Sequence, residues 1–428
     1  MNKKFFIIGV PSLFIGILGV VLLSIYGLSR MDGSVAEKAA FAAFSRAYTE
    51  FVESDMDFTK CLSFYGEEKQ RYSGNILFND TDRTDFVYAG LLKGIPIEYS
   101  VVRSPGEQLT GIDIMLGGDG HMHVDGVVSQ SEIILRAEEF YDGYFKVPNS
   151  NIKENYNASL WYSLFGDILA AFPDEFSIDL YPDIDFKEYI ISECLKRYDN
   201  DGVLDGIIHG VSVEKAESSK EFLVGDNYIS AGAYEVTVSK KSSEALLEML
   251  SDYTGIKPEA LWKPEKYKFT AYISSDKILR GLEIEASLPV NGNNYDINLF
   301  IALRGKNNIF EKVLADVKAV SANSETYSFR LLIDNIIENE TQKVMIIAAM
   351  NEPYISRLFE TELKRNILTN EFTADMAVNI PGLSVKGLCN GSIYKDKIVV
   401  PENALGIYEL NLWQILNIYS AANWSFIK

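Results

Sequence analysis

The residues best suited to chemistry in this chain form a short alternating run of acids and histidines: Asp119, His121, His123 and Asp125. Successive side chains of a β-strand point to opposite faces of the sheet, so on a strand these four would share one face. Imidazole nitrogens and carboxylate oxygens are ligands that Zn²⁺ accepts in proteins. His121, His123 and Asp125 are therefore candidate metal ligands, and a metal-dependent hydrolase centred on His121 and His123 is one hypothesis for the function.

The scarcity of histidine weighs against this hypothesis. Catalytic zinc sites draw further ligands from distant segments, and the chain has a single other histidine, His209. The alternative is that the four residues lie on the solvated face of a hairpin, with Met122 and Val124 toward the core. The sequence also contains neither a phosphate-binding glycine loop nor a Gly-x-Ser-x-Gly nucleophile elbow. It therefore predicts no cofactor and favours a non-enzymatic protein.

Composition limits the class of protein further. Of the 428 residues, 47% are apolar and 12% are aromatic, which is typical of a folded chain with more than one hydrophobic core. The net charge of -20 excludes nucleic acid as a partner, because phosphate binding needs clustered Lys and Arg. The three cysteines allow at most one disulfide, so packing must hold the fold together, which suits a bacterial exported protein.

An uncharged apolar run covers Phe5–Leu28 and follows Lys3 and Lys4. A helix rises about 1.5 Å per residue, so this run is long enough to cross a hydrocarbon core of about 30 Å. The positive charges before it predict a cytoplasmic N-terminus and an extracytoplasmic remainder. A cleaved signal peptide is the alternative, since Ser34-Val35-Ala36 fits a cleavage site, but its apolar core is normally only about 7 to 15 residues long. The prediction is a single-pass signal anchor in the cell membrane.

A helix is expected after this run, from Ser34 to about Asp57. Phe44, Tyr48 and Phe51 recur at spacings of three and four, which places them on one helical face. Ser34 and Glu37 have the spacing of a capping box, which favours a helix start at this point. Shorter helical patterns cover 161–172, 186–195, 246–253 and 412–419.

Period-two patterns dominate the chain from Tyr72 onward. The turn residues Ser104–Glu107 separate two alternating runs, which predicts a hairpin, and the connections that follow are too short for helical crossovers. The sheets are therefore expected to be antiparallel. The expected strands are 97–103, 109–116, 121–129, 132–137, 140–147, 207–215, 221–224, 233–238, 267–274, 282–288, 295–303, 310–319, 326–337 and 343–350, and 353–400 is ambiguous.

These elements predict an α+β fold class with antiparallel β-meander domains and packed helices behind an N-terminal transmembrane helix. Lys257–Pro264 carries the composition of a linker. The predicted division is an anchor at 1–30, a first extracytoplasmic α+β domain at 31–255 and a second, β-rich domain at 256–428.

The order of these elements resembles that of bacterial envelope proteins with LolA/LppX-like half-barrels. Long meanders are bracketed by apolar helices, and the strand Tyr234–Val238 runs directly into the helix Leu246–Leu250. The resemblance implies a curved sheet that wraps around helices and encloses an apolar cavity for lipid or acyl chains. Many such proteins carry a lipid anchor where this chain has an apolar helix.

The functional prediction is a non-enzymatic, membrane-tethered extracytoplasmic binding or carrier protein. Its expected partners are the membrane through Phe5–Leu28, a lipid or other apolar ligand, and an envelope protein. The 4 Trp, 24 Tyr and 24 Phe residues motivate an apolar ligand, although the same residues could simply fill two cores.

Overall fold

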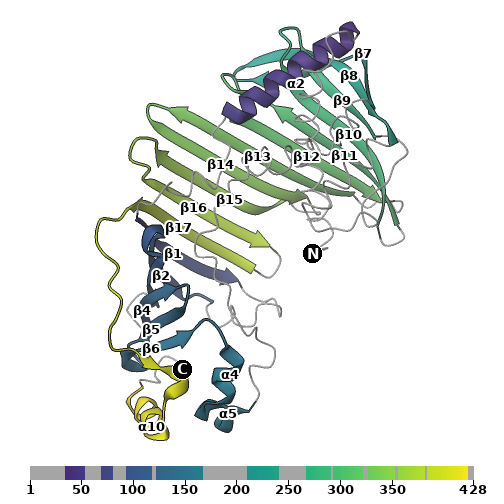
Figure 1. The fold of residues 1–428 in the computed structure, drawn as a ribbon. Coiled ribbons are helices and arrows are strands. Elements are labelled where there is room, and N and C mark those ends of the chain that lie inside the picture. The colour runs from purple at the N-terminus through teal and green to yellow at the C-terminus, as the bar shows by residue number, and fades with distance from the viewer. Residues whose placement is uncertain are drawn as a thin grey trace. The chain divides into compact units, whose positions relative to one another are not determined.

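The fold is almost entirely β-sheet, as the computed structural model in Figure 1 shows. All strands belong to one 18-stranded sheet, and every pairing with a given register is antiparallel except that of the two-residue strand β18 with β6. The residues that the structure describes are 34–53, 69–80, 93–117, 122–166, 210–240, 267–290, 293–321, 326–351, 355–380 and 383–422.

This sheet corrects the predicted fold class. An α+β chain with two half-barrel domains would have two separate sheets with helices packed into each, whereas here one sheet takes up all the strands. The resemblance to LolA/LppX-like half-barrels is wrong for the same reason. The error arose because strand patterns reveal each hairpin but not how distant hairpins join.

The chain divides into two compact units, which are described in turn. Unit 1 comprises residues up to 59 and 184–362, and unit 2 comprises 60–183 and 363–428. Each unit therefore combines an early and a late part of the sequence. The predicted linker, Lys257–Pro264, lies outside the described residues.

Unit 1 is an antiparallel meander with one long helix, α2, packed across it (Figure 1). Consecutive strands pair from β7 to β14. The elements are α2 (Val35–Glu53), β7 (Val211–Val224), β8 (Asn227–Val238), β9 (Tyr267–Ser274), β10 (Leu279–Val290), β11 (Asn293–Leu303), η6 (Ile309–Glu311), β12 (Lys312–Ser321), β13 (Thr326–Glu338), β14 (Thr341–Asn351) and most of β15 (Ile355–Asn366).

Helix α2 closes the core of unit 1. Ala40, Ala43, Phe44 and Ala47 are fully buried and pack with one face of strands β7 to β13. Small alanine side chains let the helix approach the sheet closely, and Phe44 fills the space between them. The predicted capping box is confirmed, since the Ser34 hydroxyl accepts from the Glu37 N–H at 3.1 Å and the Glu37 carboxylate accepts from the Ser34 N–H at 2.7 Å.

Unit 2 is a second meander whose early and late strands meet. β1 pairs with β2 on one side and with β17 on the other, β16 pairs with β17, and consecutive strands pair from β2 to β6. The elements are β1 (Gln70–Asp80), β2 (Pro96–Ser104), η3 (Pro105–Glu107), β3 (Leu109–Leu116), β4 (Met122–Ser129), β5 (Glu132–Ala137), β6 (Tyr141–Pro148), α4 (Ile152–Asn157), α5 (Leu160–Phe165), β16 (Phe372–Ile380), β17 (Leu383–Ile393), β18 (Leu405–Gly406), η7 (Ile407–Glu409) and α10 (Leu412–Ala421).

Most predicted strands lie within a residue or two of the observed ones. Two short strands, 207–215 and 221–224, prove to be the single strand β7, whose register shifts between Lys215 and Ser219. A shift of this kind lets a strand continue through a polar interruption that breaks its alternation. The ambiguous stretch 353–400 contains β15, β16 and β17. The helices expected at 186–195 and 246–253 lie outside the described residues.

The predicted membrane anchor is also corrected. Within the described part of the chain, no helix combines the length and apolar character needed to cross a membrane. Phe5–Leu28, from which the anchor and the membrane partner were predicted, lies outside the described residues. The predicted single-pass signal anchor is therefore not among the helices of the described residues.

Candidate functional site

The sheet of unit 2 has two chemically different faces. Residues opposite each other in an antiparallel pair point to the same face, so the strand registers define rows of side chains across the sheet. One row starts at Phe372 and passes through Gly391, Tyr72 and Val101 to Ile112. The neighbouring row on the same face starts at Ala374 and has no charged residue either.

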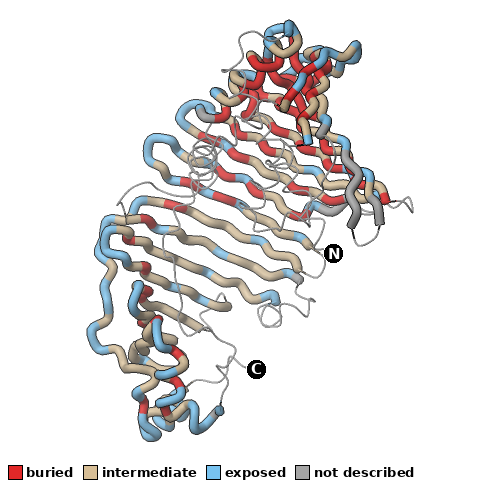
Figure 2. The backbone as a smooth tube through the Cα atoms, turned by 45° about the vertical axis from the view of Figure 1, so that its right-hand side comes forward, coloured by how far each residue is buried: buried red, intermediate tan, exposed pale blue. Residues whose placement is uncertain are grey.

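This apolar face extends over eight strands. Most of its side chains are half-buried, unlike the buried side chains beneath α2 in unit 1 (Figure 2). No described helix lies along it as α2 does along the sheet of unit 1 (Figure 1). Its apolar members are Phe372, Ala374, Met376, Val378, Ile380, Leu383, Val385, Gly387, Cys389, Gly391, Tyr72, Gly74, Ile76, Phe78, Ile97, Tyr99, Val101, Ile112, Ile114, Leu116, Met122, Val124, Gly126, Val128, Ile133, Leu135, Ala137, Tyr141, Phe145 and Val147. Gln70, Arg103 and Thr110 lie on the same face, in the row at its edge.

Aromatic rings lie over glycines on this face. The Phe372 ring occupies the space that a Cβ on Gly391 would take, and the Tyr99 hydroxyl lies near the equivalent point of Gly74. That hydroxyl donates to the Leu388 carbonyl at 3.2 Å, and the Tyr72 hydroxyl on the neighbouring strand donates to Gln70 at 2.8 Å, so both phenols are already hydrogen-bonded. Burial raises the pKa of Tyr99 and that of the neighbouring Cys389 thiol. Both groups are therefore neutral at physiological pH, and the middle of the face is uncharged.

The opposite face carries a polar network. Asp125 accepts hydrogen bonds from Arg136 Nε at 2.9 Å and from the Tyr144 hydroxyl at 2.5 Å. Burial alone would raise the pKa of Asp125, but these two hydrogen bonds outweigh burial and lower that pKa. Arg136 also lies over the Tyr144 ring, 5.0 Å from its centroid. Asp125 is thus held as a carboxylate in a structural cluster.

His123 lies two residues before Asp125 on the same face. Its Nε2 is 3.2 Å from an Asp113 oxygen and its Nδ1 is 3.5 Å from a Glu138 oxygen. Burial alone would lower the pKa of His123, but hydrogen bonds with Asp113 and Glu138 outweigh it and raise that pKa. Both ring nitrogens donate when the imidazole is protonated, so the two carboxylates favour an imidazolium.

A cavity of about 340 Å³ opens on this polar face. The segment Tyr394–Pro401 covers part of the sheet there. The side chain of Ile398 packs against Gly111, 3.6 Å from the position that a Cβ on Gly111 would take. The sheet residues that line the cavity include Arg71, Ser100, Asp113, Asp125 and Tyr144. Arg71 donates to the Ser100 hydroxyl at 3.1 Å, and Asp125 and Tyr144 bond each other, so much of the polar lining is paired within the protein.

The structure brings only part of the predicted metal site together. His123 and Asp125 share a face as predicted, whereas His121 and Asp119 lie outside the described residues. In the described ranges, no group of three or more His, Cys, Asp or Glu side chains is arranged to hold a metal ion. The ring nitrogens of His123 and the oxygens of Asp125 bond other side chains. Metal binding by His121, His123 and Asp125 stays a prediction.

Two features of this region were missed by sequence reasoning. The covering segment Tyr394–Pro401 falls in the stretch interpreted as ambiguous, although its Ile-Val-Val run could have indicated packing. The continuity of the apolar face was missed because it depends on the pairing of β1 with β17. Within each strand, however, the period-two alternation already indicated one apolar and one polar side.

Comparison with known proteins does not assign this chain to a protein family. No protein-family model matches the chain, and no curated protein matches it in sequence. Similar solved structures include a mutant of the Rh. blastica porin, at 10% identity over 76% of this chain and 99% of that one, with a TM-score of 0.21. Pseudomonas putida OprB matches at 9% identity over 82% and 97%, with a TM-score of 0.19. A BenF-like porin from Pseudomonas fluorescens matches at 7% identity over 76% and 98%, with a TM-score of 0.16.

These similarities do not define what this chain does. At TM-scores of 0.21 and 0.19 the backbones do not superpose as one fold.

Proposed function

We propose that the chain is a non-enzymatic binding protein that takes up an apolar, chain-like ligand, such as the acyl chain of a lipid, on the apolar face of unit 2. The observation that carries the proposal is the uninterrupted set of half-buried apolar side chains across β16, β17 and β1 to β6. A partly exposed apolar surface of this extent is unusual and marks an interaction site.

The chemistry of the face favours hydrocarbon over a polar ligand. In the described strands its one charged side chain, Arg103, lies in the row at its edge, and the hydroxyls of Tyr99 and Tyr72 are already hydrogen-bonded within the protein. A polar ligand group placed there would lose its hydrogen bonds to water without replacement. A methylene group gains about 0.8 kcal/mol when it is buried, so a chain of several methylenes supplies enough free energy for micromolar binding.

Titration with a pyrene-labelled long-chain fatty acid tests the proposal. Saturable binding to the full chain is expected. Ile114→Ser removes an apolar contact of about 1 kcal/mol and should raise the Kd roughly five-fold. The matched control is Met115→Ser, because Met115 is the next residue but lies on the opposite face with 38% of its surface exposed.

The Met115 variant should bind the probe as the wild type does. Far-UV circular dichroism of both variants separates a loss of folding from a loss of binding. Absence of saturable binding by the wild type, or equal weakening by both substitutions, would overturn the proposal. The first outcome is also what would be seen if another part of this chain covers the face.

A further inference from the structure

We infer that α5 and α10 form a docking surface for the interfacial region of a lipid bilayer. Six of the fifteen large apolar side chains that are exposed in the described residues lie on these two short helices. They are Tyr162 and Leu164 of α5, and Leu412, Trp413, Leu416 and Tyr419 of α10. Their concentration on two helices distinguishes them from the scattered apolar side chains found on most surfaces.

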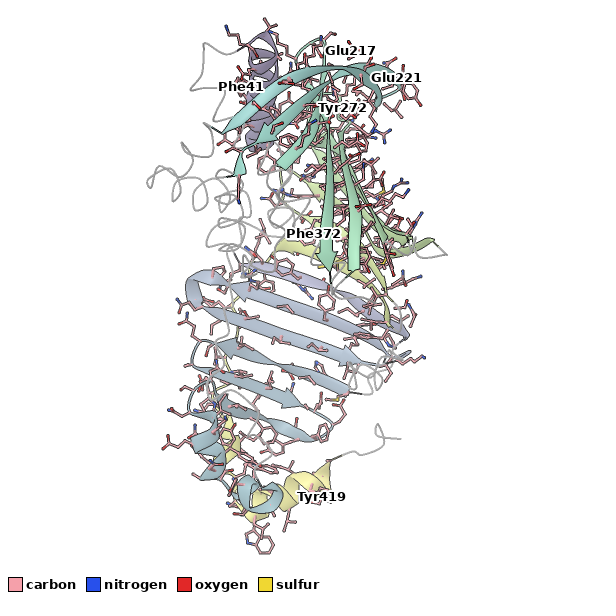
Figure 3. All side chains as sticks on the ribbon, turned by 90° about the vertical axis from the view of Figure 1, so that its right-hand side faces the viewer. Phe41, Glu217, Glu221, Tyr272, Phe372 and Tyr419 are labelled. Carbon is pink, nitrogen blue, oxygen red and sulfur yellow. The ribbon has the colours of Figure 1, made fainter. Side chains whose placement is uncertain are left out.

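The two helices are held together by contacts near η7. The Trp161 indole N–H of α5 donates to the Ile407 carbonyl at 2.7 Å, and α10 begins a few residues later. Figure 3 shows α10, with Tyr419 labelled, beside the short helices α4 and α5. A capping box fixes the start of α10, since Asn411 and Gln414 each accept from the backbone N–H of the other. The apolar side chains are thus displayed on an ordered element.

Helix α10 exposes its apolar side chains in a stripe and buries none of its residues. Leu412, Leu416 and Tyr419 recur at spacings of four and three, which places them along one face. Trp413 beside them is 76% exposed and Tyr419 is 65% exposed. Indole and phenol rings with one apolar and one hydrogen-bonding part are typical of membrane–water interfaces.

Charge favours a lipid surface over a protein partner. The stretch Leu410–Ala422 contains no acidic or basic residue, in a chain with a net charge of -20. Its polar residues are amides and a hydroxyl, which can remain hydrogen-bonded at headgroup depth without burial of a charge. At ten residues α10 is about 15 Å long, so it would lie in the interface and not cross it. The net negative charge further predicts a preference for zwitterionic over anionic lipid.

Hydrogen exchange of the full chain with phosphatidylcholine vesicles tests this inference at the helix itself. The amides of Leu412–Ala421 should exchange about ten-fold more slowly when vesicles are added, because lipid contact suppresses the opening of the helix. This readout does not depend on how any other part of the chain meets the vesicle. Replacing the vesicles with phosphatidylserine-rich ones should weaken the protection.

The paired substitutions Trp413→Ser and Leu416→Ser should abolish the vesicle-induced protection. The matched control is Leu368→Ser, because Leu368 is 71% exposed but lies in the turn between β15 and β16. That control should keep the protection. Loss in both variants, or no protection in the wild type, would overturn the inference.

A second copy of this chain is the competing partner. Protection of α10 that increases with protein concentration in the absence of vesicles, together with a dimer in sedimentation velocity that Trp413→Ser dissociates, would replace the lipid surface with self-association. None of the six side chains belongs to the apolar sheet face. Failure of this inference therefore leaves the proposed ligand site untouched, and the converse also holds.

Discussion

The two units treat the apolar side of their strands differently. In unit 1, helix α2 lies across strands β7 to β13, and Leu299 and Val236 beneath it are 1% and 0% exposed. In unit 2, the apolar face of β16, β17 and β1 to β6 keeps most of its side chains half-buried (Figure 2). The alternating pattern is the same in both, so the helix decides whether such a face becomes a closed core. A face without such a helix remains able to bind something else.

Removing the central side chain of α2 should have the largest effect on stability, because α2 closes the core of unit 1. Phe44→Ala leaves a cavity between helix and sheet and should lower the free energy of unfolding by about 3 to 5 kcal/mol. Chemical denaturation followed by circular dichroism measures the loss. Val35→Ala is the control on the same helix, because Val35 is 87% exposed and its truncation should change stability by no more than about 0.5 kcal/mol. Equal stability of Phe44→Ala and wild type would mean that α2 does not close the core.

A Leu→Ala substitution on the apolar face of each unit should have an intermediate effect on the free energy of unfolding. Leu299→Ala in β11 should cost about 2 to 5 kcal/mol, because Leu299 is 1% exposed beneath α2. Leu116→Ala in β3 should cost only about 1 kcal/mol, because the half-buried side chain of Leu116 contributes less buried apolar area to the fold. Denaturation of the two variants side by side measures the difference. A cost for Leu116→Ala as large as that for Leu299→Ala would show that the face of unit 2 is a closed core as well.

Loss of the helix cap should have a smaller effect. Ser34→Ala removes the hydroxyl that accepts from the Glu37 N–H, and an N-cap of this kind contributes about 1 kcal/mol. The thermal midpoint should fall by a few degrees, while fatty-acid binding by unit 2 stays the same. Weaker binding of the probe in Ser34→Ala would argue against separate roles for the two units.

The smallest expected effect is the change in stability with pH that the His123 imidazole contributes. Its raised pKa means that its stabilising contribution is fully present below the unfolded-state pKa of about 6.5 and is lost as pH rises through the folded-state pKa. Wild type should therefore lose stability relative to His123→Gln as the pH rises above the unfolded-state pKa of about 6.5. Parallel denaturation curves for the two proteins over this range would show that Asp113 and Glu138 do not stabilise the imidazolium.

Local features of the fold were predictable from the sequence, and long-range ones were not. The capping box of Ser34 and Glu37 and the hairpin of β2 and β3 rest on residues close in sequence, and both are found. The pairing of β1 with β17 brings Ser73 and Asn390 together across 317 positions, and no local pattern specifies it. That pairing joins the strands into one sheet, whereas separate sheets were expected.

The candidate site shows the same limit. The shared face of His123 and Asp125 follows from strand alternation and was predicted correctly. Their engagement by Asp113, Glu138, Arg136 and Tyr144 depends on which strands become neighbours, so the sequence alone left both a metal site and a solvated hairpin face open. Tyr99 likewise reaches the Leu388 carbonyl, 289 positions away, only because Gly74 lies between the two strands.

Photo-crosslinking with a diazirine-bearing fatty acid tests the central claim, that the apolar face of unit 2 holds an apolar chain, most directly. Peptide mass spectrometry after irradiation of the full chain would locate the attachment points. The crosslinks should fall on the apolar-face residues of β1, β2, β3 and β17, such as Ile76, Ile97, Ile114 and Val385, and unlabelled fatty acid should compete for them. Crosslinks on the polar face or beneath α2, or labelling that competitor does not reduce, would contradict the claim.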